Sequence, residues 1–149
     1  MNEEEINLSK TEESEELKQE EGDLEKEKAV PFTYHHSFAI SDEKELNLFV
    51  SGFRNGVSVY LYENYPQMGS LSLAIPATSL TGRSELLPIF AGQHQIMANA
   101  LAEIVSNKIQ SPCLASVFLS ETNVDISILS KLINEALPEI LKLKKTKEL

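Results

Sequence analysis

The sequence has little of what most catalytic and membrane proteins need. It holds one cysteine, three histidines and no tryptophan among 149 residues. The single cysteine, Cys113, cannot form an internal disulfide, which agrees with a reducing compartment. No stretch reaches the roughly 18 apolar residues that span a bilayer, and the first residues, Met-Asn-Glu-Glu-Glu, do not resemble a signal peptide. We therefore expect no membrane contact and a cytoplasmic location, with the nucleus left open.

The residues that usually carry catalysis or bind metal are also poorly placed. His35 and His36 are adjacent, so on a strand they point to opposite faces and cannot chelate one metal together. His94 is predicted to be a partly exposed residue at a helix start, without other ligands at metal-binding spacing. Cys113 follows a proline in an apolar run, which is typical of a structural thiol. We predict no catalytic, metal-binding or cofactor-binding residue and no enzyme; a small hydrolase or transferase using Cys113 or His94 is the least favoured alternative.

Negative charge is concentrated at one end of the chain. Residues 1–28 contain twelve Glu and Asp against four Lys, a net charge of −8, and the remainder carries a net charge of only −2. Residues 1–29 have too few apolar groups to offset the entropy of ordering, so we predict an acidic disordered N-terminal arm. Residues 30–149 are predicted to form a single domain with a basic C-terminal tail. Because basic residues cluster nowhere else, we expect no nucleic-acid partner.

The spacing of apolar residues predicts an α+β fold. Apolar residues alternate with polar ones in four segments, 32–40, 46–50, 57–61 and 71–75, as in a meander of three or four strands. Asn55-Gly56 predicts a type I′ hairpin turn, and Pro88 marks residues 86–91 as an edge strand. Residues 93–109 have helical spacing, with Ile96 and Ile104 in the apolar stripe. A buried strand at 113–119 and a second helix that Pro138 kinks or ends complete the pattern. We expect a mostly antiparallel sheet of about six strands with two C-terminal-half helices packed on one face.

Strand alternation predicts a second apolar face. If Val57, Val59 and Leu61 meet the helices, the residues between them point away. This outer surface is then aromatic, and such side chains are enriched in interface cores. A dimer packed through it is the natural inference, although a one-residue register slip would swap the two faces. The predicted contact residues are Phe49, Phe53, Tyr60 and Tyr62.

Two segments resemble the proteasome assembly chaperone 3 family. Residues 63–76 form a turn with Met68-Gly69 followed by a strand that closes on Pro76, and Phe90-Ala-Gly-Gln opens a helix. The similarity spans residues 46–141 and excludes the acidic arm and the lysine-rich tail. By motif, only Met68 and Gly69 carry over as partner-binding residues. Each also has an ordinary structural interpretation, as a packing filler and as a turn glycine with positive φ.

The resemblance implies a non-enzymatic chaperone for early 20S proteasome α-ring assembly. It implies a heterodimer with a related small protein, similar to proteasome assembly chaperone 4, that holds an α-subunit, the fifth. The main alternative is a small dimeric α+β scaffold or adaptor of a trafficking or signalling complex.

Overall fold

The computed structural model describes residues 31–78, 82–120 and 126–147. The acidic arm predicted for residues 1–29 lies outside the described residues. Within the described part, no helix is long and apolar enough to cross a membrane.

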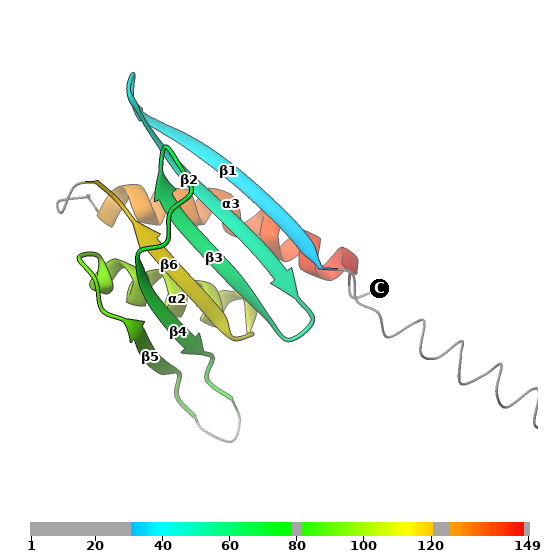
Figure 1. Cartoon of the computed structure of the whole chain (residues 1–149). Coiled ribbons are helices and arrows are strands. Elements are labelled where there is room, and N and C mark those ends of the chain that lie inside the picture. Colours follow the sequence, from blue (N-terminus) through cyan, green and yellow to red (C-terminus); the bar gives the residue numbers. More distant parts are fainter. Residues whose placement is uncertain (1–30, 79–81, 121–125, 148–149) are drawn as a thin grey trace, which may run out of the picture. The chain divides into compact units, whose positions relative to one another are not determined.

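The described residues form one sheet and two helices, and Figure 1 shows both helices behind the same face of the sheet. This confirms the predicted α+β class, with a six-stranded, mostly antiparallel sheet and two helices in the C-terminal half. In chain order the elements are β1 (Phe32–Ser41), β2 (Lys44–Phe53), β3 (Gly56–Glu63), β4 (Ser70–Ile75), β5 (Glu85–Phe90), α2 (Gln95–Ile109), β6 (Cys113–Phe118) and α3 (Ile126–Lys147).

The strand order confirms a meander of three strands and excludes the fourth. The order in the sheet is β1-β2-β3-β6-β4-β5, so β1, β2 and β3 follow one another in space, whereas β4 and β5 pair with each other on the far side of β6. β6 lies between β3 and β4; it runs parallel to β3 and antiparallel to β4. The connection from β3 to β4, residues 64–69, therefore crosses the carboxyl end of β6, and we call it the crossing segment. β5 is an edge strand, as Pro88 predicted.

The core lies between the sheet and the helices. Val57, Val59 and Leu61 are at most 5% exposed, which confirms the predicted inward face of β3. The buried apolar residues of the strands form one hydrophobic cluster with those of both helices. Leu132 and Ile140 of α3 are buried in this core. The helix continues through Pro138, so of the two predicted effects, a kink or an end, the end was wrong.

The stripe that helix α2 turns to the core overlaps the predicted stripe only in part, at Leu101 and Val105. Ile96 is 81% exposed, and Ile104 is 39% exposed. The buried stripe is instead built on the residues Ala98, Leu101, Ala102, Val105, Ser106 and Ile109. The reason lies in β4, which turns the small side chains of Ser70, Ser72 and Ala74 toward the helix layer. Small side chains on both elements let α2 approach the sheet closely, and the larger isoleucines are left outside.

The β2–β3 hairpin forms, but with a different turn. Phe53 pairs with Gly56, so the two loop residues are Arg54 and Asn55, and none of these turn residues has a positive φ. The predicted type I′ turn at Asn55-Gly56 was therefore wrong. A β-carbon on Gly56 would lie 2.8 Å from the carbonyl oxygen of Pro112, so glycine is needed there because β6 begins against it.

Glu63 fastens the end of β3 to the end of β6. Its carboxylate accepts hydrogen bonds from the Ser120 hydroxyl at 2.7 Å and the Ser120 N–H at 3.1 Å, and Lys44 Nζ lies 3.8 Å away. Burial by itself raises the pKa of Glu63, but the two bonds from Ser120 and the charge of Lys44 outweigh it, so the pKa lies below its usual value. The charged carboxylate therefore stabilises this junction.

Candidate partner-binding face

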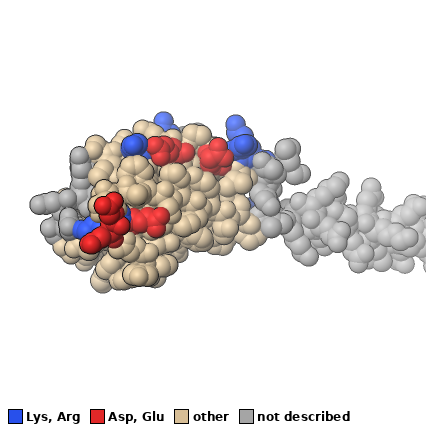
Figure 2. Space-filling view, turned by 90° about the horizontal axis from the view of Figure 1, so that it is seen from above, with Lys and Arg blue, Asp and Glu red and all other residues tan. Residues whose placement is uncertain are grey.

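The sheet has a face that the helices leave uncovered, and we call it the outer sheet face. Its centre consists of partly exposed residues, which are Phe49, Tyr60, Tyr62, Leu71, Leu73, Leu114 and Phe118. Among the outward positions of the described strands, the charged residues are Glu45 and Glu85, both at the ends of strands. Figure 2 looks from above, along the sheet rather than onto this face, and shows the charged side chains on that side in separate groups with uncharged surface around them. The face combines apolar area with few charges, as interface cores do.

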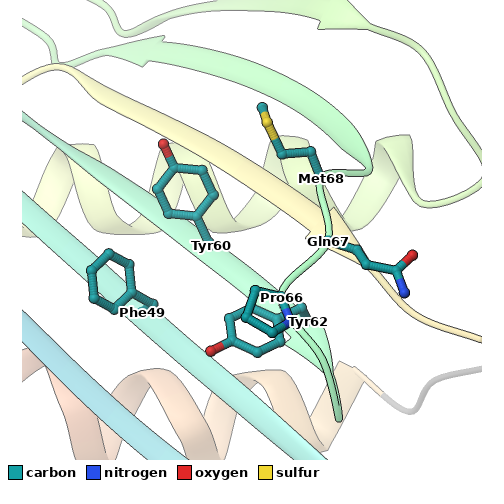
Figure 3. Close-up of a pocket in the computed structure, with 6 residues that line it drawn as sticks. All are labelled: Phe49, Tyr60, Tyr62, Pro66, Gln67 and Met68. Carbon is teal, nitrogen blue, oxygen red and sulfur yellow. The ribbon is translucent and has the colours of Figure 1, made fainter.

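A groove of about 480 Å³ is hollowed into this face. Phe49 on β2 and Tyr60 on β3 form a cross-strand pair whose ring centroids lie 6.2 Å apart, at an interplanar angle of 41°. Figure 3 shows these rings with the residues of the crossing segment beside them. The complete lining is Phe49, Tyr60, Tyr62, Pro66, Gln67 and Met68. The sheet thus supplies the aromatic floor, and the crossing segment supplies a wall.

Four of the six residues predicted to bind a partner come together in this groove. Sequence reasoning missed Pro66 and Gln67, although both lie in the segment that carries the family resemblance. They could have been found from their position directly before Met68, because neighbouring residues of one short segment lie against the same surface.

Phe53 and Gly69, the two other predicted residues, do not line the groove. Phe53 is 52% exposed at the end of β2. Gly69 does not have the positive φ of the predicted turn glycine. Its N–H donates to Ser116 Oγ at 3.1 Å, and a β-carbon on it would overlap the carbonyl oxygen of Val117. Gly69 therefore lets the crossing segment lie directly against β6, which is a positioning role for the groove wall.

The groove is suited to bind an apolar group of another molecule. Met68 is 67% exposed, and its thioether is flexible and polarizable, so it can adapt to the shape of a partner. The hydroxyls of Tyr60 and Tyr62 and the amide of Gln67 add hydrogen-bonding groups to an otherwise apolar lining. Such a mixture of aromatic area and a few polar groups is typical of protein–protein contact residues.

The residues considered for catalysis have structural roles. Cys113 is fully buried, and burial raises the pKa of its thiol to about 12, so it stays protonated. His94 is only 7% exposed, which corrects its predicted partial exposure, and its Nε2 lies 2.9 Å from the carbonyl oxygen of Leu119. That contact ties the start of α2 to the end of β6.

The other histidines occupy opposite faces of β1, as predicted. His35 Nε2 lies 3.1 Å from Asn47 Oδ1, whereas His36 Nε2 lies 3.2 Å from Glu135 Oε2 on α3. In the parts of the chain that the structure describes, no three His, Cys, Asp or Glu side chains gather closely enough to hold a metal ion.

Comparisons with known proteins give a similarity of fold. No family model matches the sequence, and no curated protein matches it. A chain from a yeast complex described as a novel chaperone complex for 20S proteasome assembly is similar to this one, with a TM-score of 0.47 and 19% identity. The similarity covers 78% of this chain and 98% of that chain. At this TM-score and identity it assigns no function.

Proposed function

We propose that this chain is a non-enzymatic assembly chaperone that pairs through its outer sheet face with a related small protein. Together the two chains hold a proteasome α-subunit, the fifth, during early 20S α-ring assembly in the cytoplasm and nucleus. The observation that carries the proposal is the aromatic groove, lined by no charged residue, in the sheet face opposite the helices. The choice of a proteasome α-subunit as the bound protein rests on the resemblance of residues 63–76 and 90–93 to proteasome assembly chaperone 3.

The physical case for a partner on this face is the apolar area that it leaves in water. Partly exposed aromatic and leucine side chains run from β2 across β3 and β6 to β4. Burying such area stabilises a complex by about 25 cal/mol per Å². Two sheets can pack face to face at a separation of roughly 10 Å, with the side chains of each filling the gaps of the other. A partner with a related sheet therefore fits the groove and the flat area around it.

A holding role agrees with what the site offers. The groove provides contact area, and its lining of aromatic, proline, glutamine and methionine residues includes no charged group. Release needs no nucleotide on this proposal, because β-subunits that arrive on the same side of the α-ring would displace the chaperone by overlap.

The first test is affinity purification of the tagged full-length chain from its native cells, followed by mass spectrometry. We expect one small partner and proteasome α-subunits without mature β-subunits. Tyr60→Ala should remove the partner, because truncating a central aromatic contact residue commonly weakens binding by 2 kcal/mol or more, about 30-fold. Tyr65→Ala is the matched control, since Tyr65 is 75% exposed and lies outside the groove lining.

Two results would contradict the proposal. One is equal recovery of the small partner by Tyr60→Ala and by the wild type, with folding verified by circular dichroism. The other is recovery of trafficking or signalling components without any proteasome subunit, which would favour the scaffold alternative.

A further inference from the structure

The two edges of the sheet differ in how they are protected against pairing with a further strand. An edge strand presents backbone N–H and C=O groups to solvent, and natural proteins blunt such edges with prolines, charged side chains or irregular pairing. β5 has these features, because Pro88 has no N–H to donate and its pairing with β4 shifts register between Leu71 and Ser72. The edge at β5 is therefore closed to another strand.

β1 forms the opposite edge and lacks this protection. Among the described strands it pairs with β2 alone, and Figure 1 shows it at the free edge of the sheet with α3 behind it. Its ten residues include no proline, glycine, lysine, arginine, aspartate or glutamate. The irregularity in its pairing falls between Ala39 and Ser41, at its end, so residues 33–39 are regular. A long, uncharged edge strand is suited to pair with a strand of another chain.

Helix α3 lines β1 with charged side chains. Lys131 Nζ lies 4.8 Å from the centroid of the Phe38 ring, and Glu135 Oε2 lies 3.2 Å from His36 Nε2. Both charged residues are exposed. Residue numbers therefore rise along α3 as they fall along β1, and one turn of the helix corresponds to two residues of the strand.

Glu139 continues this row of charges one turn later, and it is also exposed. The pKa of Tyr34 is raised first by burial and then by the negative charges of Glu139 and Glu135, which places Glu139 near this tyrosine. Along the edge of the sheet, the row thus consists of one positive charge followed by two negative charges.

The middle of β1 defines how a second copy fits this edge. His36 is the central residue of the regular segment 33–39. If the β1 strands of two copies pair antiparallel about a two-fold axis at His36, this residue faces itself, and Tyr34 faces Phe38 of the second copy. Aromatic cross-strand pairs of this kind stabilise a sheet.

The same axis makes the charges of α3 complementary to themselves. Because Tyr34 and Phe38 face each other across the axis, Lys131 lies on the side of Glu139 of the second copy, and the reverse contact occurs at the other end of the row. Glu135 lies near the axis, where its charge is directed to the histidine of its own chain. Opposite charges at both ends of the row favour a second copy over an unrelated strand.

We propose that a second copy of this chain pairs with β1, antiparallel and centred on His36, so that one sheet continues through both copies. This contact does not rest on the proposed function, because it uses the edge of the sheet and leaves the outer sheet face of each copy uncovered. With the axis perpendicular to the sheet, both outer sheet faces lie on the same side. Each copy then still has a face for its own small partner.

The test exchanges the charges at the two ends of the row in the full-length chain. Lys131→Glu and Glu139→Lys each place like charges opposite one another in the pair, and the double variant restores opposite charges. The two positions are eight residues apart, about 12 Å along the helix, so they do not compensate each other within one chain.

Sedimentation velocity over a range of protein concentrations measures dimerisation, and circular dichroism verifies folding. Tyr60→Ala is the matched control, because it changes the groove of the outer sheet face and leaves β1 intact. We expect each single variant to dimerise at least about tenfold more weakly than the wild type, because the like-charge contact occurs twice in the pair. The double variant should dimerise within about threefold of the wild type, and Tyr60→Ala should be unchanged.

Three results would overturn the inference. If Tyr60→Ala loses dimerisation and the single variants retain it, two copies pack through the outer sheet face instead. If the double variant dimerises as weakly as the single variants, the two charges do not face each other across an axis. If the wild type stays monomeric at every concentration, a second copy does not occupy this edge, which leaves it to a strand of a different protein. Recovery of α-subunits tests the proposed function separately from all three.

Discussion

Replacing Gly69 by alanine tests whether the Met68-Gly69 motif acts through structure. An ideal β-carbon on Gly69 would overlap the carbonyl oxygen of Val117 and lie 2.7 Å from its carbonyl carbon and 2.9 Å from the Cα of Phe118. These are backbone atoms in a central strand, so no side-chain rotation relieves the overlap. The crossing segment must move away from β6, and the bond from the Gly69 N–H to Ser116 Oγ is then lost.

The expected loss of stability follows from these two effects. Forcing an extra carbon into a packed region costs about 1–3 kcal/mol. Losing one hydrogen bond costs a further ~0.5–1.5 kcal/mol. We therefore expect Gly69→Ala to lower the free energy of unfolding by about 2–4 kcal/mol, and to lower the melting temperature by roughly 8–16 °C for a domain of this size.

The assay is urea denaturation followed by circular dichroism, with Gly82→Ala as the control. Gly82 also needs a glycine, because its φ is 65°, but a β-carbon there would meet nothing within 4 Å. The control should cost only about 1 kcal/mol, from the left-handed backbone. A Gly69→Ala variant within 0.5 kcal/mol of the wild type, roughly the accuracy of such differences, would refute the close approach of the crossing segment to β6.

Two further predictions concern the ends of β6. Glu63→Gln should lower the free energy of unfolding by about 1–3 kcal/mol at pH 7, because it removes the charge that Ser120 and Lys44 stabilise. Since the pKa of Glu63 is lowered by folding, this stabilisation is complete above the ordinary pKa of 4.5 and is lost as the pH falls through the lower, folded value. Denaturation at pH 7 and at decreasing pH should show the variant approaching the wild type; a constant difference across this range would contradict the assignment. Cys113 should not react with Ellman's reagent at pH 8 in the native chain, because the thiol is buried and its pKa is about 12, and it should react fully in denaturant. Rapid stoichiometric reaction of the folded chain would show that the β6 thiol is accessible.

Local pattern was sufficient to determine much of the fold. Alternation with a period of two depends only on the geometry of an extended chain, so the sequence alone placed Phe49, Tyr60 and Tyr62 on the face opposite Val59 and Leu61. The same reasoning identified the hairpin, the edge position of β5 and the two helical segments. It also showed that acidic residues are concentrated in residues 1–28.

Only the tertiary structure decided how these pieces meet. Nothing local in residues 113–118 says that β6 inserts between β3 and β4, because strand pairing at long sequence separation depends on the whole sheet. That insertion sends the crossing segment over β6, and so it creates the groove wall and the close approach at Gly69. The exposure of Ile96 likewise depends on the small residues of β4 across the core, since a helix turns to the sheet whichever stripe packs best.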